Sequence, residues 1–421
     1  MRRYNARWIV PVSTPPLRDG TVAVQGGRIA YVGPRAGAPP GEDCELGDAL
    51  LLPGLINAHT HLELTTLRGF LEGFAFRDWV ATLQRAKVAV LDEDRLLDAA
   101  RAGIAEGLRA GITCYADTCD SGVAIRAMRE AGVRGIMYQE VFGPAPGKCH
   151  VALEELARKI AAHLANADSL RQVGVSPHAP YTVSDVLYTR VARYAASERL
   201  PIAIHIAESV EEHALVCEGK GPFADAWRAR GIAVETRGRS PIELMERLGM
   251  LGRHTLAIHC VNADESDIAL LSRSDTAIAH CPISNAKLGH GAAPVDRFLA
   301  AGLRVGLGSD SMASNNRMHM LEEARAAVLS LRIQMRSASE LPAALALELA
   351  TLGGARALGL EARIGSLEPG KDADMAAFPL GAAAPAAEHD PAVAAVWSLG
   401  NAVASLVTVQ GTELVRDSRI L

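Results

Sequence analysis

Residues 51–61 read LLPGLINAHTH, and this stretch decides the fold. An apolar run, residues 51–56, leads into His59 and His61. Alternate residues of an extended strand point to the same side, so both imidazoles can reach one ion. With 13 His in the chain, a chance His-x-His is expected about 0.4 times. The position of the pair at the end of a strand therefore matters more than the pair itself.

Seven further apolar, β-branched runs follow, and helical patterns rich in Ala, Leu, Arg and Glu separate most of them. The runs are residues 111–116, 134–141, 173–176, 201–206, 255–258, 276–279 and 304–307. Strands that alternate with helices over about 260 residues predict an α/β fold, a (β/α)8 TIM barrel. No Gly-x-Gly-x-x-Gly opens a helix, which argues against a doubly wound sheet.

The two chain ends have a different pattern, with short strands broken by Pro and Gly. They predict one small β-sandwich domain built from residues 1–52 and 362–421, while residues 53–361 form the barrel domain. Two connections, residues 62–93 and 209–250, are longer than the barrel requires. Extra length after a barrel strand predicts a lid over the substrate.

The composition bears on which partners the protein binds and where in the cell it works. With 43 Lys+Arg against 48 Asp+Glu and no basic run, we expect no nucleic-acid partner. The most apolar window, residues 393–409, contains too many polar residues to span a bilayer, so we expect strands of the small sheet and no membrane partner. Seven Cys without a Cys-x-x-Cys pair, and no signal-peptide pattern, favour reduced thiols and a cytoplasmic location. The sequence is compatible with a homo-oligomer.

Metal-ligand residue types gather at the predicted strand ends. They are His59 and His61 after the first run, His178 after the fourth, His205 and Glu208 at the fifth, His259 at the sixth, His280 at the seventh and Asp310 at the eighth. His59, His61, His205 and Asp310 together provide three imidazoles and a carboxylate, which suit one Zn²⁺ or Fe²⁺ with a position left for water.

The other histidines have a structural alternative, because a single His at a strand end is more often a hydrogen-bonded core or surface residue. His178 and His280 keep both interpretations. We expect the remaining histidines to be structural, with a lid contact left open; they are His150, His163, His213, His254, His290, His319 and His389.

Five segments carry a family resemblance. They are residues 53–61, residues 176–182 (SPHAPYT), residues 205–209 (HIAES), residues 308–311 (GSDS) and residues 365–374 (GSLEPGKDAD). In order and spacing the chain resembles the amidohydrolase superfamily. Within it, the chain is similar to the branch of amino-heterocycle deaminases and chlorohydrolases, which includes the methylthioadenosine/S-adenosylhomocysteine deaminases and the aminodeoxyfutalosine deaminases.

The resemblance implies one divalent metal ion held by His59, His61, His205 and Asp310. Zinc is favoured, with iron and manganese as alternatives. Members with two metals use a carboxylated Lys on the fourth strand, and residues 170–176 contain no Lys.

The chemistry of such a site follows from its residues. A bound divalent ion lowers the pKa of its water to about 7. Asp310 can accept a proton from that water, and His259 can orient it. Glu208 can protonate a ring nitrogen next to the attacked carbon, after which ammonia leaves. A lid salt bridge is the alternative role for Glu208.

Two features of the sequence bear on the substrate. In the methylthioadenosine/S-adenosylhomocysteine deaminases a Glu after a Trp-containing segment holds the ribose diol, but here no Glu follows Trp79 before Glu93. Arg85 and Lys87 either meet an anionic substituent or form a solvated helix face. Residues 138–144, 221–223 and 240–241 are closer to the aminodeoxyfutalosine deaminases, which implies a substrate with a carboxylate and a role in menaquinone biosynthesis.

The sequence thus predicts an aminohydrolase that acts on the C–N bond of a cyclic amidine. We expect it to deaminate an adenine-type nucleoside, with 6-aminodeoxyfutalosine favoured over methylthioadenosine and S-adenosylhomocysteine. Glu208, His259 and Asp310 are the expected catalytic residues, and His178 and Glu208 are expected to bind the small heterocyclic substrate. Alternatives are a guanine or pterin deaminase, a triazine chlorohydrolase and, from another class, a non-catalytic metal-binding scaffold.

Overall fold

The computed structural model describes residues 1–421 and contains two eight-stranded sheets. The first is the predicted barrel, in which neighbouring strands follow chain order and run parallel. Its strands are β5 (Leu55–Thr60), β6 (Ile112–Cys119), β7 (Arg134–Val141), β8 (Arg171–Pro177), β9 (Ile202–Ile206), β10 (Thr255–His259), β11 (Ala277–His280) and β12 (Val305–Leu307). A parallel bridge between Thr60 and Asp310 brings the last strand back to the first, so the barrel is nearly closed.

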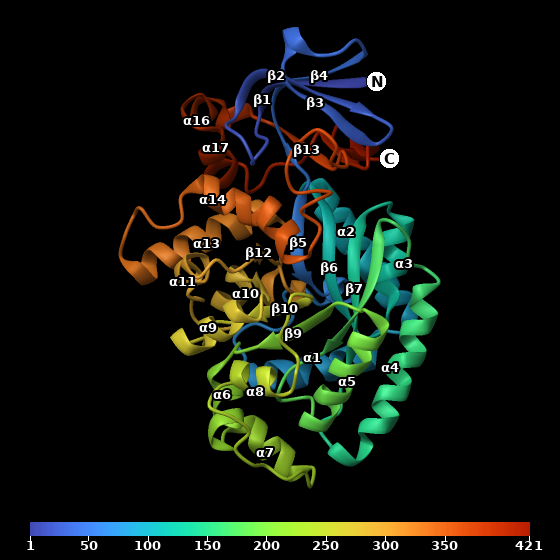
Figure 1. Ribbon diagram of the computed structural model, residues 1–421, viewed down its shortest axis with the longest axis vertical. Coiled ribbons are helices and arrows are strands. Elements are labelled where there is room, and N and C mark those ends of the chain that lie inside the picture. The colour runs from blue at the N-terminus through green and yellow to red at the C-terminus, as the bar shows by residue number, and fades with distance from the viewer.

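Helices lie between and around these strands (Figure 1). The helices of the barrel region are α1 (Phe76–Val90), α2 (Glu93–Arg109), α3 (Val123–Glu130), α4 (Cys149–Leu164), α5 (Asp185–Glu198), α6 (Val210–Glu218), α7 (Pro222–Ala229), α8 (Pro241–Arg247), α9 (Glu265–Arg273), α10 (Pro282–Lys287), α11 (Val295–Ala300), α12 (Met312–Asn315), α13 (Met320–Met335), α14 (Ala343–Glu348) and α15 (Gly354–Ala357), with the 3₁₀ helices η2 (Leu62–Leu67) and η3 (Pro146–Lys148) and the π-helix η4 (Leu349–Gly353). Asp92 and Asp264 cap α2 and α9, so local sequence determines where these helices begin.

The second sheet joins both chain ends, as predicted. Its order is β16-β15-β14-β13-β4-β1-β2-β3. The strands are β1 (Arg2–Ile9), β2 (Leu17–Gln25), β3 (Arg28–Pro34), β4 (Glu42–Pro53), β13 (Met375–Pro379), β14 (Leu406–Val409), β15 (Thr412–Arg416) and β16 (Arg419–Ile420), with η1 (Arg35–Gly37), η5 (Gly381–Ala383), α16 (Ala384–His389) and α17 (Pro391–Ser398) beside them. One apolar core, including Tyr4, Val22 and Met375, is shared by strands from both ends. We propose residues 1–52 with 362–421, and residues 53–361, as the two domains.

Two predicted segments differ from the structure. Residues 51–56 are not one strand, because β4 ends at Pro53 in the terminal sheet and β5 begins at Leu55 in the barrel. Gly54 allows this change of sheet, since a Cβ there would lie 2.1 Å from Oγ1 of Thr113. The pattern did not reveal the break because both segments are apolar and buried.

The second difference lies in the window 393–409, which is not all strand. Its first part belongs to α17, and only β14 joins the sheet. Asp390 accepts hydrogen bonds from the backbone N–H groups of Ala392 and Val393 and so caps the helix, while Pro391 occupies its first turn.

Both long connections lie at the carboxyl end of the barrel strands. Residues 62–93 form η2 and α1, and residues 209–250 contain α6, α7 and α8. Phe76, Trp79, Tyr181, Phe223 and Trp227 from this region belong to one apolar cluster. In Figure 1, α7 lies at the opposite end of the molecule from the terminal sheet.

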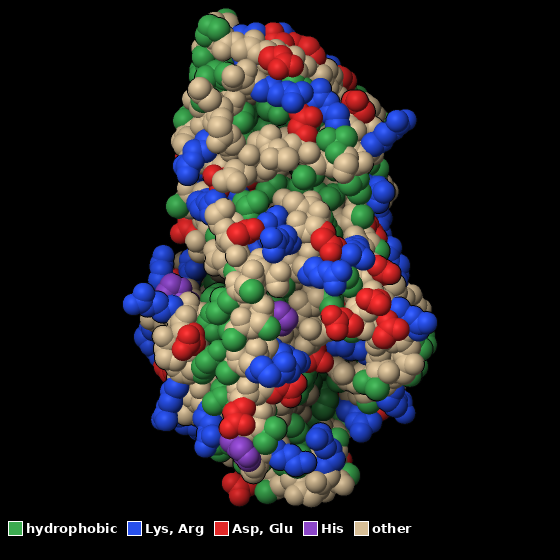
Figure 2. All heavy atoms as spheres, turned by 90° about the vertical axis from the view of Figure 1, so that its right-hand side faces the viewer, with side chains coloured by type: hydrophobic (Ala, Val, Ile, Leu, Met, Phe, Trp, Pro, Cys, Tyr) green, Lys and Arg blue, Asp and Glu red, His purple; other side chains and the backbone are tan.

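The surface carries charges of both signs. Figure 2 shows Lys and Arg side chains interspersed with Asp and Glu over one face of the molecule. No helix has both the length and the apolar character needed to cross a bilayer. The absence of nucleic-acid and membrane partners stays a prediction.

Candidate active site

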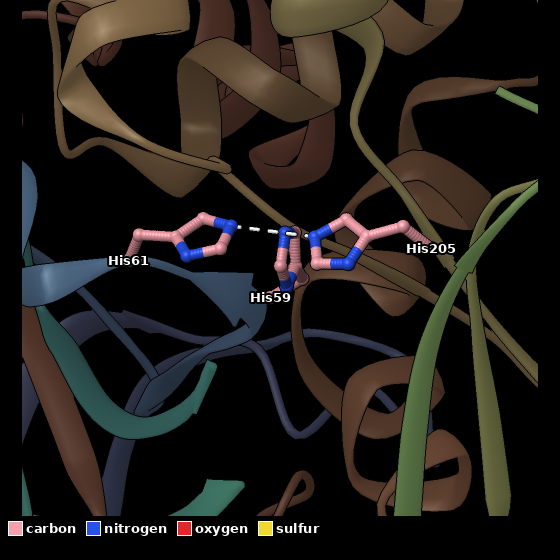
Figure 3. A group of neighbouring side chains, drawn as sticks. All are labelled: His59, His61 and His205. Atoms are coloured by element: carbon pink, nitrogen blue, oxygen red, sulfur yellow. Dashed lines mark hydrogen bonds between the residues drawn. The ribbon is translucent and has the colours of Figure 1, made fainter. Parts of the chain in front are cut away.

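Four of the predicted ligand residues meet at the carboxyl end of the barrel. His59 lies on β5 with His61 directly after it, His205 lies on β9, and Asp310 follows β12. In Figure 3 the rings of His61 and His205 point toward one another, with His59 between them, and their Nε2 atoms are 3.3 Å apart. Oδ1 of Asp310 lies 3.3 Å from Nε2 of His59 and 3.6 Å from Nε2 of His61. The four side chains therefore face one small space.

This donor set fits a divalent cation. Although Nε2 of His59 is close to Asp310, neither ring nitrogen of His59 forms a hydrogen bond. Burial, together with the neighbouring His59, lowers the pKa of His61 to about 3, and burial lowers the pKa of His205 well below its usual value. Neutral imidazoles are the form that binds metal. Three of them with one carboxylate match the ligands of zinc and iron.

Asp310 is held in one orientation by three donors. Its Oδ1 accepts the backbone N–H of Ser311 at 2.7 Å, and its Oδ2 accepts the hydroxyls of Ser284 at 2.5 Å and Ser314 at 3.0 Å. Its φ of 57° is unfavourable for a residue with a side chain, a strain that often marks functional sites. Burial raises the pKa of Asp310, but the adjacent His59 more than offsets this, so the pKa falls well below its usual value. The carboxylate is ionised.

Glu208 lies in the same pocket, in the turn after β9. Its Oε1 is 3.6 Å from Nε2 of His259 and 3.4 Å from Nε2 of His290, and the hydroxyl of Tyr181 donates to Oε2 at 3.5 Å. Burial raises the pKa of Glu208, but His259 and His290 outweigh burial and the net shift is downward. Glu208 is thus an ionised carboxylate that can take up and return a proton.

The turn that presents Glu208 depends on a second buried carboxylate, that of Glu212. Its two oxygens accept the backbone N–H groups of Ala207 at 2.9 Å and Glu208 at 2.8 Å. Ala207 has a φ of 50°, and these bonds hold the strained turn in place.

His259 ends β10 and is oriented by Asn285, whose Oδ1 lies 2.9 Å from Nδ1 of the ring. Because an amide oxygen only accepts, Nδ1 carries the proton. With Nδ1 bonded to Asn285, Nε2 is the nitrogen that faces Glu208.

His290, expected from the sequence to be structural with a lid contact left open, lies beside Glu208. Its side chain is 4% exposed, and its ring packs edge-on against Phe76 with centroids 4.5 Å apart. Burial lowers the pKa of His290, but Glu208 more than offsets this and raises it. No strand end or periodic pattern points to this residue, because it lies in an irregular segment whose path depends on tertiary packing.

His178 lines the pocket, whereas His280 does not. Nδ1 of His178 lies 2.8 Å from Oγ1 of Thr182, and burial lowers the pKa of His178 to about 4. His280 is buried with neither ring nitrogen bonded, and burial lowers its pKa to about 3.

The first long connection, residues 62–93, lines the pocket directly, whereas the second, residues 209–250, lies behind the pocket wall. The lining residues are His61, Glu63, Leu64, Phe76, Trp79, Val80, Leu83, Gln84, Lys87, Glu140, His178, Tyr181, His205, Glu208, His259, Leu288, Asp310 and Ser311. Behind this wall, Tyr181 stacks on Phe223 with ring centroids 4.2 Å apart. The side formed by α1 is therefore mainly apolar and aromatic.

Of the two basic residues considered on α1, Lys87 reaches the pocket and Arg85 does not. Arg85 is exposed and donates to Oγ1 of Thr82 at 3.1 Å. Lys87 forms an ion pair with buried Glu63. Burial raises the pKa of Glu63, but Lys87 outweighs burial and lowers it to about 2. The charge of Lys87 is therefore already compensated within the protein.

Comparisons with solved structures agree with the barrel. An adenosine deaminase from Xanthomonas campestris with bound zinc superimposes with a TM-score of 0.87 at 28% identity, covering 100% of this chain and 94% of that one. An aminofutalosine deaminase from Helicobacter pylori in complex with methylthio-coformycin gives a TM-score of 0.86 at 22% identity, covering 99% and 100% of the two chains. At that identity the second likeness concerns the fold alone.

Sequence comparison shows a likeness over nearly the whole chain as well. A 5-methylthioadenosine/S-adenosylhomocysteine deaminase from Desulforudis audaxviator is 35% identical over 421 residues, which cover 98% of this chain and 93% of the relative. The model of the amidohydrolase family matches residues 50–403. The predicted resemblance is confirmed: this chain belongs to the amidohydrolase family.

Proposed function

We propose that this protein is a metal-dependent deaminase that hydrolyses an amino group from an adenine-type nucleoside. The observation that carries the proposal is the proximity of Glu208 to His259 in the pocket that also contains His61, His205 and Asp310 of the ligand set. Hydrolysis of an aromatic amine requires protonation of a ring nitrogen while water attacks the adjacent carbon, and this pocket has groups for both tasks. The deaminases among the relatives support the same activity.

His59, His61, His205 and Asp310 would hold one divalent ion. Zinc is the first choice because it suits the donor set and is present in the related adenosine deaminase; iron and manganese are the alternatives. When bound, the ion lowers the pKa of water to about 7 and so supplies a nucleophile at neutral pH.

The residues of the chain move the two protons of the attacking water. His259 orients the water through Nε2. One proton reaches the ring nitrogen through Glu208, which turns the neighbouring carbon into an electrophile. The other reaches the leaving amino group through Asp310. Collapse of the tetrahedral intermediate then expels ammonia and leaves a carbonyl on the ring.

For the substrate we favour an adenine nucleoside with a bulky 5′ substituent, and 6-aminodeoxyfutalosine first. Two segments similar to the aminodeoxyfutalosine deaminases contribute here, since Glu140 lines the pocket and Phe223 supports its wall through Tyr181. This substrate belongs to menaquinone biosynthesis. Methylthioadenosine and S-adenosylhomocysteine come next, because the sequence relatives bear those names and the α1 wall suits a thioether. The seven cysteines are free thiols, in keeping with a cytoplasmic location.

The experiment is an ammonia-release screen on 6-aminodeoxyfutalosine, methylthioadenosine, S-adenosylhomocysteine, adenosine and guanine. We expect turnover of the adenine nucleosides with guanine far behind. Release from guanine alone would favour the guanine deaminase alternative. No release from any of them would favour another leaving group, such as chloride from a triazine.

A matched pair of variants tests the role of Glu208. Glu208→Gln should lower kcat about 10²- to 10⁴-fold while metal content and unfolding temperature stay unchanged. Glu218→Gln, at an exposed position of α6, should behave like the unaltered protein. Retained turnover in Glu208→Gln would contradict the assigned role. A metal content near zero in the purified protein, with no turnover, would instead favour a scaffold.

A further inference from the structure

The proposed reaction leaves one end of the pocket unexplained. In the barrel order, Glu140 lies near the end of β7 and His178 follows β8, whereas Glu208 and His259 lie after β9 and at the end of β10. The substrate ring reacts beside Glu208 and His259. The rest of the substrate then extends toward Glu140.

The position of Glu140 in β7 directs its side chain into the barrel. Ile136 and Tyr138, four and two residues earlier, belong to the core inside the barrel, whereas Met137 and Val141 pack on the outer side. Residues at alternate positions share a face. Glu140 continues the inner row at the carboxyl end, where it lines the pocket.

Glu140 is buried without a hydrogen-bond partner. The residue is 6% exposed, and its Oε1 is inaccessible to solvent and accepts no hydrogen bond. The nearby cation, Lys87, is engaged by Glu63 and lies 3.5 Å from Asp120. A buried acceptor without a donor is rare in a folded protein and is destabilising. A donor from a ligand would remove that penalty.

His178 also offers an acceptor at this end of the pocket. The hydroxyl of Thr182 donates to the carbonyl of Ala179 at 3.1 Å, so its oxygen accepts from Nδ1 of His178 at 2.8 Å. With the proton on Nδ1, Nε2 of the neutral ring is an acceptor. Nε2 of His178 and the unpaired Oε1 of Glu140, whose pKa is raised to about 8 by burial, therefore both require donors.

A second metal ion is a poor match for these acceptors. Donor atoms of Glu140, His178 and His205 do lie within 4.8 Å of one another. However, Nδ1 of His205 is 3.2 Å from the carbonyl oxygen of His178, to which it donates. Only Nε2 of His205 is free, and it faces His61 in the ligand set already described. An ion here would compete for that same nitrogen, so neutral donors such as hydroxyl groups fit better.

We propose that Glu140 is a specificity residue that accepts a hydrogen bond from a secondary hydroxyl of the nucleoside sugar. The inference rests on the proposed function and deepens it, since it says which part of the substrate this end of the pocket binds. Helix α1 brings no carboxylate to the pocket. The other carboxylates of the pocket are engaged: Glu63 pairs with Lys87, Glu208 faces His259 and His290, and Asp310 accepts from Ser284 and Ser314. Glu140 on strand β7 is the acceptor left for the sugar.

The first test compares adenosine with 2′-deoxyadenosine and 3′-deoxyadenosine on the metal-loaded enzyme. The unaltered protein should favour adenosine over at least one deoxy analogue by about 10- to 100-fold in kcat/KM. Glu140→Gln and Glu140→Ala should lose most of that preference, because they slow adenosine but hardly affect the analogue that lacks the bound hydroxyl. Glu154→Gln, an exposed position on α4, is the matched control. Equal losses on all three nucleosides, or none, would overturn the proposal.

The second test measures binding without turnover. Calorimetry with inosine, 2′-deoxyinosine and 3′-deoxyinosine should show the same preference in the unaltered protein and its loss in Glu140→Gln. The unfolding temperature of Glu140→Gln should stay the same or rise, whereas a structural role predicts a fall. If ammonia release fails but this binding pattern holds, the proposed reaction is wrong and the sugar site stands. If ammonia release occurs without the pattern, the sugar site is wrong. If no nucleoside binds, both are wrong.

Discussion

Strand β7 carries a buried ionisable side chain at each end, and the two differ in whether that side chain is paired. At its start, Arg134 is 1% exposed and donates from Nε to Asp374 at 2.8 Å and from Nη2 to Asp372 at 2.9 Å. Near its other end, Glu140 has no partner. Asp372 also accepts from Arg363 at 2.7 Å.

The paired charges at the start of β7 stabilise the fold, whereas the unpaired polar groups at its carboxyl end belong to the pocket. Asp372 and Asp374 directly precede β13, so the paired charges join the barrel to the terminal sheet. At the carboxyl end, Glu140 and His59 keep polar atoms without partners and face the pocket or the ligand set. Removing a paired charge should destabilise the fold, whereas removing a group from the pocket should reduce activity and leave the fold intact.

Asp310→Asn should have the largest effect. Without a carboxylate to move a proton, we expect kcat for the best substrate to fall about 10²- to 10⁴-fold. The free energy of unfolding of the metal-free protein should change by less than about 1 kcal/mol, because an amide can still bond the surrounding serines. Steady-state ammonia release and urea unfolding measure the two quantities. A large loss of stability with normal turnover would contradict the proposal that residues at the pocket end of the barrel serve activity rather than stability.

Arg134→Met should have the opposite profile. It leaves Asp372 and Asp374 buried without their shared cation, which should lower the free energy of unfolding by about 3–5 kcal/mol. Turnover of the folded fraction should be unchanged. Arg126→Met is the matched control, because Arg126 pairs with Glu130 at the surface and such pairs contribute about 1 kcal/mol or less. Equal losses of stability in the two variants would contradict the role of the buried cluster.

The same contrast shows what the sequence can predict. The barrel and the convergence of His59, His61, His205 and Asp310 were predictable, because strand alternation and the rule that barrel strands end at one face place these residues by local pattern. Glu208 and His259 follow from the same rule. Their roles as ligands and catalytic groups stay proposals.

The far end of the pocket was not predictable in that way. The pairing of Lys87 with Glu63 depends on how α1 folds back over η2, and the contact of His290 with Glu208 depends on an irregular segment. Glu140 does lie at a strand end, yet nothing in the sequence says that it would be left without a donor. Such properties arise from tertiary packing, which periodicity does not report.

Lys87→Met tests a paired charge inside the pocket and should have an intermediate effect. The pKa of Glu63 in the folded protein is about 2 against an ordinary value of 4.5. Because the folded pKa is the lower one, the pair's contribution is present above about pH 4.5 and is lost as the pH falls toward 2. The pair of Lys87 and Glu63 contributes about 3 kcal/mol to the free energy of unfolding. Urea unfolding from pH 5 to 2 should show this loss in the unaltered protein and not in Lys87→Met. Parallel pH profiles would refute the coupling.

Thr182→Val should have the smallest effect, because it removes a single hydrogen bond, the one between Thr182 and Nδ1 of His178. Valine keeps the shape of threonine but removes the oxygen that accepts from Nδ1 of His178. The ring is then free to place its proton on Nε2, which turns the acceptor in the pocket into a donor. We expect KM to rise about 2- to 10-fold with kcat nearly unchanged, since one neutral hydrogen bond contributes about 1 kcal/mol. Thr189→Val, on α5 outside the pocket, is the control. If kcat falls instead of KM rising, His178 takes part in the proton transfers and the division between a reacting end and a binding end of the pocket is wrong.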